Sequence, residues 1–153
     1  NAIHACIATA FTDPGVPFDE ARAASILDGF QLKGAIEPSA VVRQIAALEA
    51  WISTRWPGCR RHAEIPIESI LPSGQVMHGR IDLLLETKDG WVLLDHKANP
   101  APRDRWDQVA DEHGGQLSVY ADALARATGR SVVETWIVLP VAAGAIQVTA
   151  RDE

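Results

Sequence analysis

The chain has 153 residues, of which 47% are hydrophobic and 22% charged, a composition that predicts one folded domain over residues 1–153 and argues against a disordered segment. Its apolar stretches are too short to cross a bilayer, so we expect a cytoplasmic protein without a membrane partner. The formal net charge of −6 at pH 7 argues against a module that holds nucleic acid by charge alone, because phosphate contacts require Lys and Arg.

Three helices are expected in the N-terminal part of the chain. Residues 1–9 are small and apolar, with His4 among them, and predict a short buried helix. Residues 18–32 have apolar side chains at helical spacing. The clearest helical pattern follows Pro38 and consists of Val41, Ile45, Leu48 and Ile52. Trp56-Pro57-Gly58 is expected to end this third helix.

The hydrophobic period then changes from helical spacing to two, which predicts a sheet. Three strands are expected, at residues 62–69, 75–87 and 91–97. Lys88-Asp89-Gly90 predicts a hairpin turn between the second and third of these strands. The two strands joined by this turn are therefore expected to be antiparallel neighbours.

The C-terminal part of the chain predicts a helix and two further strands. Residues 98–113 are polar and predict a loop with one short helix. Gly114-Gly115 is expected to precede a longer helix that ends at Gly129. Residues 132–139 predict a buried strand, and residues 145–149 can pair beside it. This order of elements predicts one α/β domain with an αβββαβ-like arrangement.

Alternation along the strands assigns side chains to the two faces of the expected sheet. One face of the second strand is expected to carry Met77, Ile81, Leu83 and Leu85, and the other His78, Arg80, Asp82 and Leu84. On the third strand, Asp95 and Lys97 share a face with Leu93 and Trp91. Because the two strands are neighbours, Asp82 and Asp95 can lie on one side of the sheet.

Asp95 is the residue whose position most needs a chemical explanation. It follows the apolar run Trp91-Val92-Leu93-Leu94, where a buried carboxylate is costly unless it is compensated. A divalent cation bound by oxygen atoms from two strands would compensate it, and Lys97 could then orient a water molecule or stabilise charge on a phosphate. The alternative is that Asp95 and Lys97 form an exposed ion pair at a strand end, and the D-x-K pattern alone favours that alternative.

Four motifs together resemble the RecB-type branch of the PD-(D/E)XK nucleases. They are, in the family's order, Ala2-Ile3-His4-Ala5, Gly79-Arg80-Ile81-Asp82, Asp95-His96-Lys97 after a hairpin, and Gln116-Leu117 with Tyr120. The resemblance implies a restriction-endonuclease-like fold, with a mixed central sheet flanked by helices. It also implies a deoxyribonuclease, an exonuclease that hydrolyses phosphodiester bonds with Mg²⁺ or Mn²⁺.

The resemblance carries roles over to individual residues. The implied metal ligands are His4, Asp82, Asp95 and the backbone carbonyl of His96. The implied catalytic residues are Asp82, Asp95, Lys97, Gln116 and Tyr120. Glu64 lies where many relatives have an acid on the preceding strand, and it reaches either a second metal ion or only a surface lysine. The chain departs from the family at His96, where Tyr or Phe is usual, and at Ala98, where Thr or Ser is usual.

The resemblance also implies partners and excludes a cluster. Only Cys6 and Cys59 are present, so the four-cysteine iron-sulfur cluster of some members of the branch is not expected. The AddA or RecB type remains, in which the nuclease domain ends a long bacterial helicase chain, and the start at Asn1 agrees with a fragment. The implied partners are single-stranded DNA ends from unwound duplex, a helicase domain in the same chain and a second helicase-nuclease subunit.

Two alternative functions stay open, and one group of arginines remains to be assigned. The chain could be an inactive nuclease-like module for docking or guiding DNA, although the complete ligand set argues against it. It could also be a stand-alone repair exonuclease of the same superfamily. Arg103 and Arg105 are candidate DNA contacts, and so are Arg55, Arg60 and Arg61, whereas the alternative for each is a solvated surface arginine.

Overall fold

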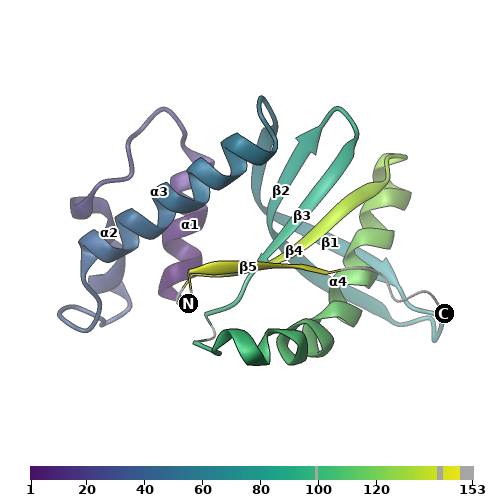
Figure 1. The fold of residues 1–153 in the computed structure, drawn as a ribbon. Coiled ribbons are helices and arrows are strands. Elements are labelled where there is room, and N and C mark those ends of the chain that lie inside the picture. The colour runs from purple at the N-terminus through teal and green to yellow at the C-terminus, as the bar shows by residue number, and fades with distance from the viewer. Residues whose placement is uncertain (99, 141–142, 149–153) are drawn as a thin grey trace. The chain divides into compact units, whose positions relative to one another are not determined.

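The computed structural model describes residues 1–98, 100–140 and 143–148, and it divides into two compact units. Unit 1 is Asn1–Cys59 and consists of helices. Unit 2 is Arg60–Glu153 and contains a sheet with one long helix. Figure 1 shows the elements of both units.

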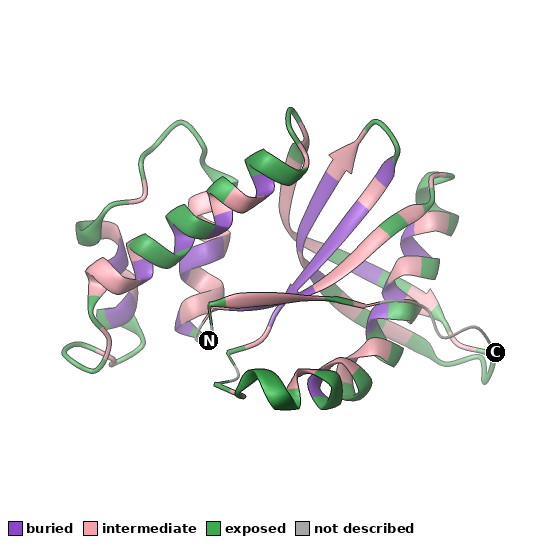
Figure 2. Ribbon diagram, in the orientation of Figure 1, coloured by how far each residue is buried: buried purple, intermediate pink, exposed green. Residues whose placement is uncertain are grey.

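The three helices of unit 1 confirm the predicted helical region. They are α1 (Ala2–Thr12), α2 (Glu20–Gly29) and α3 (Pro38–Arg55). The Asn1 side chain caps α1 by accepting a hydrogen bond from the backbone N–H of His4 at 3.1 Å, and Asp19 caps α2 in the same way. Figure 2 shows buried positions recurring along each helix, as expected for helices that share a core.

The sheet of unit 2 has five strands in the order β1-β2-β3-β4-β5. They are β1 (Arg60–Ile70), β2 (Val76–Thr87), β3 (Gly90–His96), β4 (Val132–Leu139) and β5 (Gly144–Val148). Neighbouring strands are antiparallel except β3 and β4, which are parallel. With α3 before β1 and a helix between β3 and β4, the element order is αβββαβ, as predicted.

The parallel pair requires a crossover, and α4 (Trp106–Thr128) provides it after the short 3-10 helix η1 (Arg103–Arg105). The prediction that Gly114-Gly115 precedes this helix was wrong, because α4 begins at Trp106, eight residues before Gly114, and continues through both glycines. Its end is correct, at Gly129 in the left-handed conformation with φ 69°. In the described part of the chain, no helix is long and apolar enough to cross a membrane.

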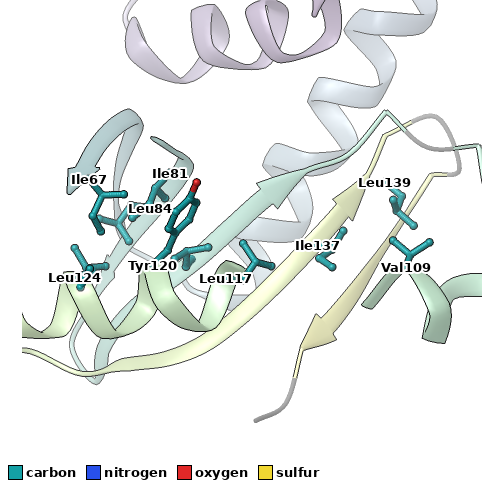
Figure 3. Close-up of a cluster of buried hydrophobic side chains, with 11 residues drawn as sticks. Ile67, Ile81, Leu84, Val109, Leu117, Tyr120, Leu124, Ile137 and Leu139 are labelled. Atoms are coloured by element: carbon teal, nitrogen blue, oxygen red, sulfur yellow. The ribbon is translucent and has the colours of Figure 1, made fainter. Parts of the chain in front are cut away.

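The core of unit 2 lies between α4 and the sheet, and Figure 3 shows it in close-up. It contains Ile67, Ile81, Leu84, Leu93, Val109, Leu117, Tyr120, Ala123, Leu124, Ile137 and Leu139. Ile81 and Leu84 are both members, so the strict alternation predicted for β2 is wrong. The change occurs opposite Glu64, whose φ of 55° interrupts the regular strand geometry of β1, and the pairing with β2 passes from Ala63 to Ile65.

Candidate active site

The two acids of the predicted site lie where β2 and β3 diverge. The ladder between these strands ends at the pair Leu83 and Leu94. Beyond that pair, β2 remains hydrogen-bonded to β1, and β3 remains hydrogen-bonded to β4. Asp82 and Asp95 are the next residues along their strands, so both side chains are placed at the point of separation.

Asp82 is held in place by the backbone of β3. The backbone N–H of His96 donates a hydrogen bond to Asp82 Oδ2 at 2.7 Å. A carboxylate thereby satisfies a backbone donor beyond the end of the ladder, which fixes the carboxylate beside β3. His96 itself is 1% exposed, in β3 between Asp95 and Lys97.

Asp95 is buried and paired with Lys97. Only 7% of the residue is exposed, and its Oδ2 lies 3.1 Å from Lys97 Nζ. The backbone N–H of Lys97 donates to the carbonyl of Val138 at 2.9 Å, which anchors the lysine at the end of β3. The alternative of an exposed strand-end ion pair therefore does not describe Asp95.

The electrostatics of Asp95 show that the two acids are close neighbours. Burial and, to a smaller extent, the Asp82 carboxylate raise the pKa of Asp95 from 3.8 to about 6, and the Lys97 ammonium opposes this shift. The carboxyl groups of Asp82 and Asp95 are near enough to hydrogen-bond to each other when one is protonated. At neutral pH the site therefore concentrates negative charge in a partly desolvated place.

This donor set fits a hard divalent cation. Mg²⁺ is bound in proteins by one or two carboxylates together with water, and Asp82 and Asp95 supply two carboxylates at one place. Within the residues that the structure describes, no three His, Cys, Asp or Glu side chains form a group that could hold a metal ion. A cation at this place would therefore depend on the two carboxylates, with carbonyl or water oxygens completing its coordination.

The second and fourth sequence motifs meet on the α4 side of the sheet. Gln116 Nε2 donates a hydrogen bond to Tyr120 Oη at 3.1 Å, as their spacing on one helical face predicts. The Tyr120 ring packs on Gly79, where an added Cβ would lie 2.6 Å from ring carbon Cε1. Gly79 is therefore required by the close approach of Tyr120, which is 6% exposed in the core.

His113 is a residue near the site that the sequence motifs did not reveal. It is half-buried on α4, between Val109 and Leu117 at spacings of four residues. Burial and, second, the charge of Lys97 lower its pKa, whereas Glu112 opposes the shift. The signal that could have found it is its place in the helical stripe that faces the sheet, and the prediction of a loop up to residue 113 concealed that stripe.

Glu64 lies on β1 opposite Asp82, in the conformation described above. Its Oε2 forms an ion pair with Arg80 Nη1 at 2.9 Å, so its partner is an arginine of the Gly79-Arg80-Ile81-Asp82 motif rather than a surface lysine. Positive φ at a non-glycine residue is strained and is concentrated at functional sites in proteins.

The remaining candidates lie in other elements. His4 is in α1 of unit 1, where its Nδ1 lies 3.0 Å from the Asn1 side chain. Arg103 and Arg105 are exposed on η1, between β3 and α4. The Arg103 guanidinium stacks on the Trp106 ring at 5.1 Å from its centroid.

The αβββαβ order and the mixed sheet define a restriction-endonuclease-like fold, and this confirms the fold expected from the sequence. The family profile described as the PD-(D/E)XK nuclease superfamily matches residues 1–152. The chain belongs to this superfamily, so it is a member of a nuclease family, as the resemblance of its motifs implied. Nucleases of this superfamily generally use divalent metal ions.

The relatives found by comparison are large helicase-nucleases. An ATP-dependent helicase/nuclease subunit of Pelotomaculum thermopropionicum is 37% identical over 79 residues, covering 50% of this chain and 6% of the relative. A protein of the same name from Desulforudis audaxviator is 31% identical over 136 residues, covering 84% of this chain and 10% of the relative. The chain thus spans about a tenth or less of the length of these relatives.

Proposed function

We propose that the chain is an Mg²⁺- or Mn²⁺-dependent deoxyribonuclease that hydrolyses phosphodiester bonds of single-stranded DNA. The observation that carries the proposal is the placement of the Asp82 and Asp95 carboxylates together where β2 and β3 diverge, with the Lys97 ammonium 3.1 Å from Asp95. Membership of the nuclease superfamily supports the same chemistry.

The roles of the residues follow from their contacts. Asp82 and Asp95 would hold the cation, together with the backbone carbonyl of His96, and a bound cation supplies Lewis-acid stabilisation of the phosphate and a more acidic water. Asp82 is oriented for this role by its hydrogen bond from the His96 N–H. Lys97 releases its ion pair with Asp95 and stabilises negative charge on the phosphate.

Gln116 and Tyr120 are the proposed helix-borne members of the site. The packing of Tyr120 on Gly79 holds α4 against the strand that carries Asp82, and the hydrogen bond from Gln116 fixes the Tyr120 hydroxyl. They would orient the groups around the carboxylates. Glu64 is proposed as a second-metal ligand or as a residue that supports Asp82 from β1, with Arg80 as its counter-ion in the metal-free protein.

The source of the DNA strand is part of the proposal. We infer that a helicase motor delivers single strands to this domain during double-strand-break repair and recombination, in a bacterial cytoplasm. The names and lengths of the relatives support a helicase in the same chain, and a second helicase-nuclease subunit is proposed with it. Arg103 and Arg105 would contact phosphates of the incoming strand. The match to residues 1–152 supports treating both units as one nuclease domain.

The central test is cleavage of end-labelled single-stranded DNA in Mn²⁺, in Mg²⁺ and in chelator. We expect wild-type cleavage with either metal ion, none in chelator, and a loss of at least about 100-fold in Asp95→Asn and Lys97→Met, a size typical of removing one group that stabilises a transition state. Asp122→Asn, an exposed change on α4, is the matched control and should cleave normally. Metal-independent cleavage, or normal cleavage by Asp95→Asn, would contradict the proposal.

A second test concerns His4, whose proposed role as a ligand rests on the resemblance alone. We expect His4→Ala to weaken Mn²⁺ binding far more than His96→Ala, because His96 contributes its backbone carbonyl. Calorimetric titration with Mn²⁺ measures this, and thermal melts in chelator show whether each variant remains folded. Equal losses in two folded variants would show that His4 is not the ligand.

A further inference from the structure

The buried stripe of α4 contains one imidazole. Val109 is 3% exposed and Leu117 is 1% exposed, and both belong to the core between α4 and the sheet. His113 is four residues from each, so it lies between them on the same face of the helix. An apolar side chain would be expected at this position of the stripe.

The sheet places the end of β3 beside two residues of β4 that α4 covers. Asp95 is paired with Ile137 in the parallel ladder. The backbone N–H of Lys97 donates to the carbonyl of Val138 at 2.9 Å, so Lys97 continues the ladder by one residue. The next residue of β4 is Leu139, which is fully buried. Asp95 and Lys97 therefore lie beside the segment of β4 that supplies Ile137 and Leu139 to the core under α4.

Two buried residues of α4 pack on two buried residues of β4. In Figure 3, Leu117 lies next to Ile137 and Val109 lies next to Leu139. His113 is midway between Val109 and Leu117 on the helix, so it lies at the level of β4 residues 137–139, beside which β3 ends. The influence of the Lys97 charge on the imidazole agrees with this placement.

We propose that His113 is a positioning residue for Lys97: from α4, its neutral imidazole accepts a hydrogen bond from the Lys97 ammonium and directs that ammonium toward the phosphate. This role rests on the proposed nuclease function. Lys97 has a flexible four-carbon stem, and its partner in the metal-free protein is the Asp95 carboxylate. When Asp95 engages a cation, Lys97 needs another acceptor, and in this proposal His113 of α4 is that acceptor.

Substitutions at residue 113 distinguish a hydrogen-bonding role of His113 from a packing role. A neutral imidazole and the carboxamide oxygen of glutamine can each accept a hydrogen bond from an ammonium, whereas leucine cannot. Burial and the Lys97 charge keep the pKa of His113 low, and the neighbouring acid Glu112 opposes the shift. Leucine should fill the stripe at least as well as histidine, so a packing role would be preserved in His113→Leu.

The first arm of the experiment measures steady-state cleavage of single-stranded DNA by the 153-residue chain. We expect His113→Leu to lower kcat by about 10- to 100-fold with little change in KM, the size found for residues that orient an active group, and His113→Gln to recover most of the loss. His78→Leu and His78→Gln, at an exposed histidine on β2, are the matched controls and should leave kcat unchanged. Equal activity of His113→Leu and wild type, or equal losses in both His113 variants, would overturn the proposal.

The second arm does not depend on nuclease activity. NMR titration of His113 in the metal-free protein should give a higher pKa in Lys97→Met than in wild type, because the neighbouring positive charge is removed. An unchanged pKa would show that the two side chains are not neighbours and would overturn the proposal. Wild-type protein that fails to cleave DNA with either metal ion would overturn the proposed function and the role of His113 in it. The titration would still show whether the side chains of His113 and Lys97 are neighbours.

Discussion

At the scale of single residues, burial and repulsion between two carboxylates destabilise the charged form of Asp95 in the metal-free protein. Asp95 is 7% exposed, and burial and the nearby Asp82 carboxylate both disfavour its charged form. Lys97 compensates this charge only in part, because the pKa of Asp95 remains raised. Such a site is stabilised when a divalent cation binds the folded state and not the unfolded chain.

The change Asp95→Asn removes one negative charge and keeps the side-chain volume. In chelator we expect the variant to be at least as stable as wild type, because repulsion from Asp82 is relieved. The expected gain in the free energy of unfolding is on the order of 1 kcal/mol. With Mn²⁺ the order should reverse, since only wild type gains the binding energy of the ion. Thermal melts in chelator and in Mn²⁺ measure both. A variant that melts far below wild type in chelator would make Asp95 a structural residue.

The raised pKa of Asp95 also predicts how stability depends on pH. Between about 3.8 and about 6 the folded state holds a proton on Asp95 that the unfolded state has lost. The bound proton therefore stabilises the folded state by on the order of 1 to 3 kcal/mol. This stabilisation is fully present below pH 3.8 and is lost as the pH rises through about 6. Urea unfolding in chelator from about pH 4 to about pH 7 measures it as the difference between wild type and Asp95→Asn. A difference that does not change with pH would contradict the prediction.

At the scale of elements, α4 is held by packing against the sheet more than by its own sequence. Two adjacent glycines each cost about 1 kcal/mol relative to alanine inside a helix, yet α4 continues through Gly114 and Gly115. Val109 is buried on the N-terminal side of the glycines, and Leu117 on the C-terminal side. The burial of both side chains by one continuous helix offsets the cost of the glycines.

Two glycine substitutions test this view of the elements. A Cβ at Gly115 would meet no atom within 4 Å, so Gly115→Ala should stabilise the protein by about 0.5 to 1 kcal/mol through higher helix propensity. A Cβ at Gly79 would lie 2.6 Å from the Tyr120 ring, so Gly79→Ala should destabilise it by about 1 to 3 kcal/mol. Denaturant unfolding of both variants is the measurement. Stabilisation by Gly79→Ala would disprove the close packing of α4 on β2.

At the scale of the whole molecule, charge limits what the chain does alone. With 20 acidic residues against 14 Lys and Arg, its net charge repels a polyanion. Arg103 and Arg105 on η1 are only two candidate phosphate contacts, so a delivered strand is needed for efficient cleavage in the proposed function.

The isolated chain is therefore expected to bind single-stranded DNA weakly, with affinity that falls further as salt increases, and to cut it slowly. Fluorescence titration of labelled DNA at several salt concentrations measures the affinity. Arg103→Ala with Arg105→Ala should weaken binding further and lower its salt dependence, since each removes one phosphate contact. Tight, salt-resistant binding by the chain alone would contradict the need for a delivering motor.

The chain's local patterns were sufficient to predict the order of elements. The period of two and the turn at residues 88–90 predicted the β2-β3 hairpin, and the i, i+4 spacing placed Gln116 and Tyr120 on one helical face, where the structure shows a hydrogen bond between them. These features depend on neighbours in the chain, whose geometry is fixed by the backbone. The resemblance of the motifs supplied the family, which composition could not.

Only the tertiary structure decided how the motifs meet. The burial of Asp95, the hydrogen bond from His96 to Asp82 and the packing of Tyr120 on Gly79 join residues from different elements. Local propensity also failed at the start of α4, where packing on the sheet overrode two glycines, and on β2, where the faces change next to Glu64 with its positive φ. The physical reason is common to all: these outcomes depend on burial and on charges that become neighbours only when the chain is folded, and a sequence pattern records neither.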